Sequence, residues 1–371
     1  MVVMALDHTR DYFHAPAFLY APTDPVLTTV PIYITRWVTH YCAPVFAFLA
    51  GVSVFLVGLR KSKSELSVFL IKRGFWLVLI ELTVVNFAWY FDLSFRTPGL
   101  FVIWVLGVSM IVLAGLIHLP QKVVAGLSIL VILGHNMLDS IELPNSVLWA
   151  ILHVFSTFKL AGDITFYTAY PIIPWFAVMS LGYCFGTLYH KSVDPKKRRS
   201  ILTVAGIICI LMFVVVRGIN LYGNLTHWEK YETLIQTIMS FMNPAKYPPS
   251  LSYLMMTLGP SLILLAYSES WRGKIIDFFQ VFGRVPFFYY VLHLYLIHIL
   301  ALIAAEISGF GWEVMILPDW VTEVAELEGY GFNLVTVYLV WIMVILLLYP
   351  LCKRFDHYKS NHKEKWWLSY L

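Results

Sequence analysis

The sequence predicts an all-α polytopic membrane protein, a transmembrane helical bundle, from its composition and from the pattern of its apolar residues. Of the 371 residues, 59% are hydrophobic and only 13% are charged, and the mean hydropathy is +0.74. Soluble domains carry about 25% charged residues, so this chain cannot cover a water-facing surface of its size. Aromatic residues reach 16%, including 13 Trp and 22 Tyr, which are enriched at membrane–water interfaces. Continuous rather than alternating apolar runs favour helices over a β-barrel.

Apolar runs close to the roughly 20 residues of a membrane-crossing helix recur along the chain. We expect about nine full spans, near residues 31–59, 68–91, 99–117, 123–138, 170–189, 201–221, 250–267, 282–305 and 332–351. No long linker, low-complexity tract or clear internal repeat separates them, so a single integral-membrane domain is expected over residues 1–371. The composition excludes a soluble enzyme, a disordered chain and a secreted disulfide scaffold.

The first apolar stretch, residues 1–6, is too short to cross a membrane. Six helical residues extend about 9 Å at 1.5 Å each, which is less than a third of the hydrocarbon core. We expect these residues to be the outer end of a truncated first helix whose inner half is absent. The alternative is a short stub that packs against the bundle without crossing it.

The basic residues are clustered, and the clusters predict the orientation. The basic loops are residues 60–63, 196–199 and 272–274 together with the tail 353–365, and the nine spans place all four on one side. The loops on the other side are longer and sparse in Lys and Arg. The positive-inside rule therefore predicts a cytoplasmic C-terminus and an extracytoplasmic segment 7–30. The net charge of +4 gives no indication of nucleic-acid binding.

Residues 7–14 form the densest polar cluster near a predicted span. Their sequence is DHTRDYFH, so a continuing helix places Asp7 and Asp11, like Arg10 and His14, one turn apart. A carboxylate beside an imidazole can orient the ring and raise its basicity, as general-base chemistry requires. The predicted catalytic candidates are Asp7, His8, Arg10, Asp11 and His14. The alternative is the end of an interfacial helix whose charges are solvated.

Ionisable residues inside the spans are functional candidates because burial in a bilayer is costly. The candidates for a substrate or transfer path are Arg36, His40, Glu81 and His293. The alternative for Arg36 and His40 is a snorkelling arginine and a packed histidine. His293 and His298 are five residues apart, so at most one is expected to face the centre, and His298 is expected to be a hydrogen-bonded core residue. No HExxH pattern is present, and no metal is expected.

Several segments in this order resemble a known family. They are MALDHTRDYF (residues 4–13), TRWVTHYCAPVFAFLAG (35–51), KRG (72–74), a looser match over 170–186, and FGRVPFFYYVLH (282–293). The chain resembles the bacterial branch of the heparan-alpha-glucosaminide N-acetyltransferase catalytic-domain family, within the transmembrane acyltransferases. The resemblance covers most of the chain, and its first two segments are the most specific. A member of the bacterial branch is expected in the bacterial cytoplasmic (inner) membrane.

This resemblance implies a membrane-bound O- or N-acyltransferase that moves an acetyl group from cytoplasmic acetyl-CoA to a sugar or glycan acceptor on the far side. By position, the family's polar residue maps to Asp7, which stands where the animal enzyme has an amide. The family's catalytic histidine maps to His8 or His14, and direct transfer and an acetyl-histidine intermediate both remain open. The cations that could bind the anionic CoA are Lys72, Arg73, Arg198, Arg199 and Arg284. The alternative is that they bind no ligand and belong to the ordinary excess of Lys and Arg in cytoplasmic loops.

Two other classes of protein remain as alternatives. A proton-coupled transporter or flippase for a small polar or glycan substrate would use the same ionisable residues as a relay, although no repeat symmetry supports it. A non-catalytic membrane scaffold is the third class. The expected partners are acetyl-CoA, a glycan acceptor and the lipid bilayer, with a homodimer as an option and no nucleic acid.

Overall fold

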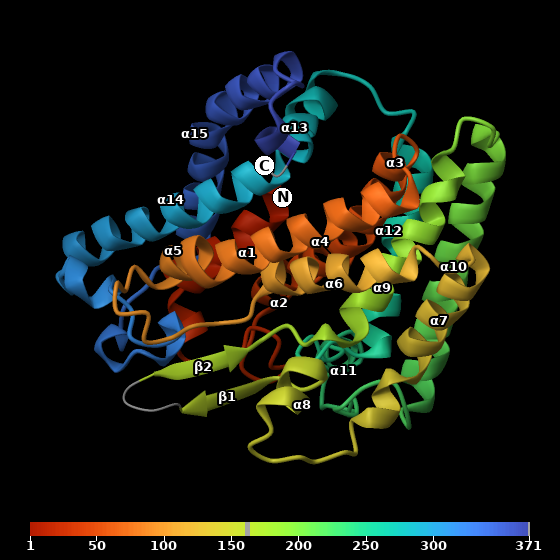
Figure 1. Ribbon diagram of the computed structural model, residues 1–371. Helices are drawn as coiled ribbons and strands as arrows, with labels where there is room; N and C mark the ends of the chain where they lie inside the picture. Colours follow the sequence, from red (N-terminus) through yellow and green to blue (C-terminus); the bar gives the residue numbers. More distant parts are fainter. Residues whose placement is uncertain (160–163, 370–371) are drawn as a thin grey trace.

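A computed structural model describes residues 1–159 and 164–369 (Figure 1). The α-helices are α1 (Val2–Phe13), α2 (Val30–Thr39), α3 (Cys42–Gly58), α4 (Lys63–Ile80), α5 (Asn86–Tyr90), α6 (Val102–Leu116), α7 (Gln121–Gly134), α8 (Val147–Leu152), α9 (Ile172–Phe185), α10 (Pro195–Ile219), α11 (Leu234–Phe241), α12 (Leu251–Ser268), α13 (Lys274–Arg284), α14 (Pro286–Ile307) and α15 (Leu334–Asn361). A short antiparallel hairpin, β1 (Ser156–Lys159) and β2 (Thr165–Thr168), pairs Ser156 with Thr168.

The helices confirm an all-α polytopic membrane protein. In the described part of the chain, seven helical segments are long and apolar enough to cross a membrane: Val30–Gly58, Gln121–Leu138, Ile172–Tyr189, Pro195–Ile219, Leu251–Ser268, Pro286–Ile307 and Leu334–Asn361. Each corresponds to a predicted span. The predicted span 99–117 lies on α6, an apolar helix of 15 residues. The predicted span 68–91 lies on α4 and α5, which are joined by the π-helical turn Glu81–Val85.

Close helix crossings build the core of the bundle, and glycine makes one of them possible. Helices α3 and α9 cross where Gly51 meets the carbonyl of Met179 and Gly182 meets the carbonyl of Phe48. A Cβ atom would lie 1.9 Å from the first oxygen at Gly51 and 2.0 Å from the second at Gly182. Small residues at such crossings allow two backbones to approach closely, which compensates for the weak hydrophobic drive between helices in lipid.

Helix α1 lies in the middle of the bundle and packs against α2, α14 and α15 (Figure 1). It runs without a break through Phe13, so the helix predicted to continue into residues 7–14 is present. The hairpin, α8 and α11 lie together at one end of the molecule, called here the hairpin end (Figure 1). The hairpin is tied to the chain before α6, because Leu100 N donates to Tyr167 O over 2.8 Å and Tyr167 N to Pro98 O over 3.0 Å.

Candidate functional site

A cavity of about 610 Å³ opens where α1, α2 and α14 meet the hairpin. Polar and aromatic side chains line it: Asp7, His8, Asp11, Arg36, Trp89, Phe101, Val102, Phe155, Thr157, Tyr167, Ala169, Tyr170, Lys246, Tyr247, Tyr290, Asp319, Trp320 and Glu323. Lys246 and Tyr247 belong to the segment between α11 and α12, and residues 319–323 to the segment between α14 and α15. Sites for small ligands typically occupy about 300–1,000 Å³, so the volume suits one.

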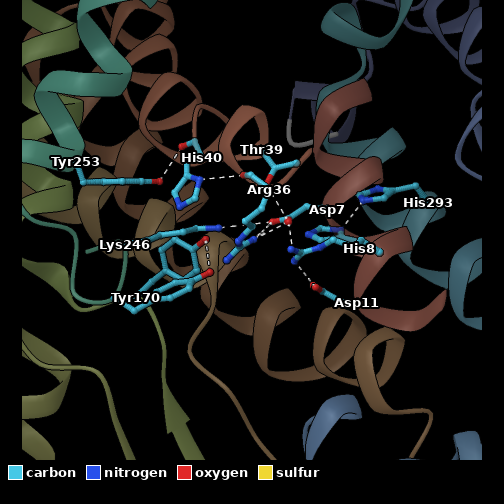
Figure 2. A network of polar contacts seen from close by, with 12 residues as sticks. Asp7, His8, Asp11, Arg36, Thr39, His40, Tyr170, Lys246, Tyr253 and His293 are labelled. Atoms are coloured by element: carbon cyan, nitrogen blue, oxygen red, sulfur yellow. Dashed lines mark hydrogen bonds and ion pairs between the residues drawn. The ribbon is translucent and has the colours of Figure 1, made fainter. Parts of the chain in front are cut away.

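Asp7 is the centre of the polar network in this cavity (Figure 2). Arg36 Nη1 donates to both carboxylate oxygens, at 2.5 and 2.8 Å, and the Thr39 hydroxyl donates to Oδ1 at 2.9 Å. Arg10 Nη2 lies 3.2 Å from Oδ1, and Lys246 Nζ lies 3.5 Å from Oδ2. One buried carboxylate therefore holds three cations from two helices and a loop. A buried carboxylate is stable only with such compensation.

Arg10 also binds a second carboxylate, that of Asp11, and so adds it to the same network. Its Nη2 atom donates to Asp11 Oδ1 over 2.7 Å, while its Nε and Nη1 atoms are buried without a partner among the described residues. Because Asp7 and Asp11 lie one helical turn apart on α1, both reach this guanidinium group. The predicted neighbour relation on α1 is therefore present, but the carboxylates bind arginine rather than the imidazole of His8.

The imidazole of His8 has a histidine partner from α14 instead (Figure 2). His8 Nδ1 lies 2.8 Å from His293 Nε2, and His293 Nδ1 lies 3.0 Å from the carbonyl oxygen of Tyr289. A carbonyl only accepts, so His293 Nδ1 carries hydrogen, and the Nε2 of a neutral His293 ring must accept from His8 Nδ1–H. This assignment leaves His8 Nε2 without hydrogen, with a lone pair available in the cavity that His8 lines.

Neighbouring rings fix the orientation of His8. The His8 ring lies parallel to that of His293, with centroids 4.9 Å apart, and edge-on to Trp89 at 4.7 Å. The Tyr290 ring lies edge-on to His8, with centroids 6.3 Å apart. Because a ring held between aromatic neighbours has few alternative rotamers, its Nε2 atom has a defined direction. A positioned base of this kind is suited to proton transfer.

A hydrogen bond joins the two walls at the hairpin end of the cavity. The Tyr167 hydroxyl on β2 donates to Asp319 Oδ1 over 2.5 Å, and Trp320 N donates to the same oxygen over 2.6 Å. Burial, followed by the bond to Asp319, raises the pKa of Tyr167, so this hydroxyl keeps its proton. Aromatic rings and the carboxylate of Glu323 complete this wall, a combination that can stack on a sugar ring and accept hydrogen bonds from its hydroxyls.

Five of the predicted residues do not line the cavity: Arg10 and His293 contact residues that do, and His40, Glu81 and His14 have other roles. His40 Nδ1 contacts the Arg36 carbonyl at 2.9 Å, so His40 supports the residue that binds Asp7. Glu81 Oε2 accepts from Ile103 N and Trp104 N, at 2.8 and 2.9 Å, and so caps the start of α6. His14 is buried at the end of α1, with its Nδ1 atom unpartnered among the described residues.

His298 is the buried core histidine that the sequence predicts. Its Nδ1 lies 2.9 Å from the Ala88 carbonyl and its Nε2 lies 2.7 Å from the Met315 carbonyl. These contacts connect α14 to α5 and to the segment that follows α14 in the sequence. The structure therefore separates the two histidines of α14: His293 meets His8, and His298 serves packing.

The five predicted CoA-binding cations lie away from this cavity. Arg198 binds the Glu269 carboxylate at 2.7 and 2.5 Å, and Arg284 lies 3.3 Å from Asp356. Arg199 stacks over the ring of Tyr267 at 3.9 Å. Lys72 is exposed on α4, and Arg73 follows it. In residues 1–159 and 164–369, no three His, Cys, Asp or Glu side chains are grouped so that they could hold a metal ion.

Sequence reasoning missed Lys246, Asp319 and Glu323. All three come from long connections, and their approach to α1 depends on how these connections fold back over the bundle. One signal was available for Lys246, because the loop 222–249 contains only Lys230 and Lys246 as basic residues on the side that is otherwise poor in them. An isolated cation there indicates a specific partner rather than an orientation signal.

Membrane-crossing helices around a cavity of histidine, carboxylate and cationic side chains define an integral-membrane protein with a polar site inside its bundle. A family model described as "Heparan-alpha-glucosaminide N-acetyltransferase, catalytic" matches residues 1–222, more than half of the chain. The chain belongs to this family and is in general terms a membrane acetyltransferase. The matched part contains Asp7, His8 and Arg36, whereas Lys246 and His293 lie beyond it. The comparisons with curated proteins and with solved structures gave no match.

Proposed function

We propose that this protein transfers an acetyl group from acetyl-CoA on the cytoplasmic side to an amine or hydroxyl of a sugar or glycan on the extracytoplasmic side. The observation that carries the proposal is the His8–His293 pair, which directs the lone pair of His8 Nε2 into the cavity. The positive-inside pattern supports the sidedness, because it predicts an extracytoplasmic hairpin end and a cytoplasmic C-terminus. The resemblance to the bacterial branch supports a bacterial inner membrane.

In the proposed reaction, His8 acts as the general base. The acceptor's lone pair forms a bond to the carbonyl carbon of the thioester, the carbonyl π electrons move to oxygen, and the acceptor's proton passes to His8 Nε2. The C=O bond then re-forms, the C–S bond breaks, and His8 returns the proton to the departing thiolate. His293 accepts a hydrogen bond from His8 Nδ1–H throughout and keeps the ring in the productive tautomer.

The lining of the cavity supports a carbohydrate acceptor. Tyr167, Tyr170, Tyr247 and Trp320 offer flat aromatic faces, and Asp319 and Glu323 offer acceptors for hydroxyl hydrogens. A donor that is large and anionic would need cations on the opposite side, where Lys72, Arg73, Arg198, Arg199 and Arg284 are located by sequence. Among these, Arg198 and Arg284 already have carboxylate partners, so they would have to exchange them for phosphate.

The test uses purified protein in proteoliposomes with radiolabelled acetyl-CoA and a panel of amino sugars and neutral oligosaccharides. We expect acetylated product with wild-type protein and loss of at least about a hundredfold in rate for His8→Gln, since a positioned base contributes about 10²–10⁴. The matched control is His227→Gln, an exposed histidine in an outer loop, which should retain wild-type activity.

Two outcomes would contradict the proposal. Wild-type protein that neither binds acetyl-CoA nor releases CoA from it would exclude this donor. Loss of activity in His14→Gln with full activity in His8→Gln would assign the reaction to the other candidate histidine, although His14 does not line the cavity. Uptake of a glycan into the vesicles without CoA release would favour a transporter.

A further inference from the structure

We propose that Lys246, together with Arg36, binds the carbonyl oxygen of the acetyl group during transfer and stabilises its negative charge, and that Arg217 positions Lys246 for this role. This inference rests on the proposed acetyl transfer and assigns to it a cation from the segment between α11 and α12. Lys246 lines the same cavity as His8 and Arg36, and it is only 9% exposed.

The ammonium group of Lys246 is close to a carboxylate but not fully engaged by it. Its Nζ atom lies 3.5 Å from Asp7 Oδ2, whereas charge-assisted hydrogen bonds between ammonium and carboxylate measure about 2.7–2.9 Å. Arg36 Nη1 occupies both oxygens of Asp7 at shorter distances. The Lys246 hydrogens are therefore available to an oxygen atom that enters the cavity, while Asp7 keeps the ammonium group at the site.

The polar network also has one positive charge in excess. Arg10, Arg36 and Lys246 are three cations, and Asp7 and Asp11 are the two carboxylates that contact them. The cavity carboxylates Asp319 and Glu323 form no ion pair with these cations among the described residues. A buried excess charge is costly unless a ligand or an intermediate compensates it. The anionic oxygen of a tetrahedral acetyl adduct would supply that compensation next to His8.

A second observation comes from Arg217, a buried cation that binds four backbone oxygens. Its guanidinium donates to the carbonyls of Phe241, Thr226 and Ser240, each at 2.9 Å, and to Asn243 at 3.3 Å. Arg217 is 2% exposed near the end of α10. It therefore fastens both ends of the segment 226–243 to the bundle. Burying a guanidinium for this purpose indicates that the position of this segment is important.

The fastened segment leads directly to Lys246. Ala245 N donates to Asn224 Oδ1 over 2.7 Å, and Ser250 N donates to Ala245 O over 3.0 Å, so the backbone on either side of Lys246 is held. The ring of Tyr247 packs edge-on against Tyr170 at 5.6 Å. Lys246 thus extends its buried side chain from a fixed backbone towards Asp7. Fixed cations aimed at a developing charge need no reorganisation during the reaction.

In the chemical step, the pair of electrons from the thioester C=O bond moves to oxygen as the acceptor attacks. The Lys246 ammonium and the Arg36 guanidinium donate to that oxygen and transfer no proton. When the C=O bond re-forms and the C–S bond breaks, the charge leaves the oxygen and the two cations keep their contacts with Asp7. All protons move through His8, so the step balances without another reactant.

The experiment compares Lys246→Met and Lys246→Arg with wild-type protein in proteoliposomes, measuring kcat, KM for both substrates and the Kd for acetyl-CoA. For Lys246→Met we expect kcat to fall by about 10²–10³, the cost of removing one oxyanion donor, with KM and Kd within about threefold. Lys246→Arg keeps the charge and should retain at least about ten times more activity than Lys246→Met. The matched control is Lys230→Met, an exposed lysine in the same loop, with wild-type kinetics expected.

Several outcomes would overturn the inference. These are a Lys246→Met kcat within about threefold of wild type, a raised KM at unchanged kcat, or equal losses in the Met and Arg variants. Size-exclusion profiles and thermal unfolding of the detergent-solubilised variants test whether a loss reflects misfolding, and misfolding of Lys246→Met leaves Lys246→Arg to decide. Inactive wild-type protein would contradict the proposed function itself, whereas active wild type, inactive His8→Gln and active Lys246→Met contradict only this inference.

Discussion

His8 and His293 lie 285 residues apart in the sequence, yet their rings are joined by a nitrogen–nitrogen contact of 2.8 Å. The contact has a direction, because the Tyr289 carbonyl requires the hydrogen on His293 Nδ1. His8 therefore donates through Nδ1 and keeps an unprotonated Nε2 in the cavity. A buried histidine that orients another histidine has the role that a carboxylate or a backbone carbonyl more often has at catalytic and metal sites.

Replacing His293 should reduce the rate without weakening binding of the donor. In His293→Phe, His8 loses the acceptor that sets its tautomer, and we expect kcat to fall roughly ten- to a hundredfold, as when an orienting partner of a functional histidine is removed. His293→Gln provides an amide oxygen that can accept from His8 Nδ1–H and should retain more activity. Steady-state kinetics with acetyl-CoA measure both, and equal activity of the Phe variant and wild type would refute the orienting role.

Breaking the bond between Tyr167 and Asp319 should affect the acceptor more than the donor. Tyr167→Phe removes the hydroxyl that joins the hairpin to the segment between α14 and α15, while the carboxylate keeps its contact to Trp320 N. We expect KM for the acceptor to rise about two- to twelvefold, because the net contribution of one hydrogen bond is about 0.5–1.5 kcal/mol. The Kd for acetyl-CoA should not change. A shift in the donor Kd with an unchanged acceptor KM would place this contact elsewhere in the reaction.

Arg217 and Lys246 should act on catalysis as one unit. Arg217→Lys keeps a charge but cannot reach four carbonyls at once, so Lys246 loses its fixed backbone and kcat should fall by about tenfold or more. The double variant with Lys246→Met should be no slower than Lys246→Met alone, because coupled residues are non-additive. Losses that multiply in the double variant would show that Arg217 supports the fold independently of Lys246.

The crossing of α3 and α9 should tolerate no side chain larger than hydrogen at Gly182. In Gly182→Ala the new Cβ would lie 2.0 Å from the Phe48 carbonyl oxygen, and the helices must move apart. We expect the free energy of unfolding to fall by about 1–3 kcal/mol, the cost of overpacking a well-packed core. Thermal unfolding in detergent, followed by tryptophan fluorescence, measures the change.

The matched control for this crossing is Gly126→Ala on α7. A Cβ atom at Gly126 meets nothing within 4 Å, and alanine is the better helix former by about 0.5–1 kcal/mol. The control should therefore be neutral or stabilising. Similar destabilisation in both variants would mean that helix propensity or detergent effects, rather than the close approach of α3 and α9, dominate the measurement.

Composition, apolar runs and helical spacing were sufficient to predict the fold class, the positions of the helices and the face that Asp7 and Asp11 share. The low fraction of charged residues and the runs of apolar residues determined the membrane bundle and the position of its helices, because a bilayer imposes a length and a polarity on each segment. The spacing of residues 7–14 likewise predicted that Asp7 and Asp11 share a helix face, and both do reach Arg10. These conclusions depend only on neighbours within a few turns.

Only the tertiary structure decided which distant segments come into contact. Glu81 and His293 are both ionisable residues in apolar helices, yet Glu81 caps α6 and His293 orients His8, and only the packing of the helices separates these roles. Lys246 reaches Asp7 because Arg217 fastens the segment before it to the bundle. The sequence by itself determined which residues are costly to bury; helix packing and loop closure, which act over hundreds of residues, determined which of them meet.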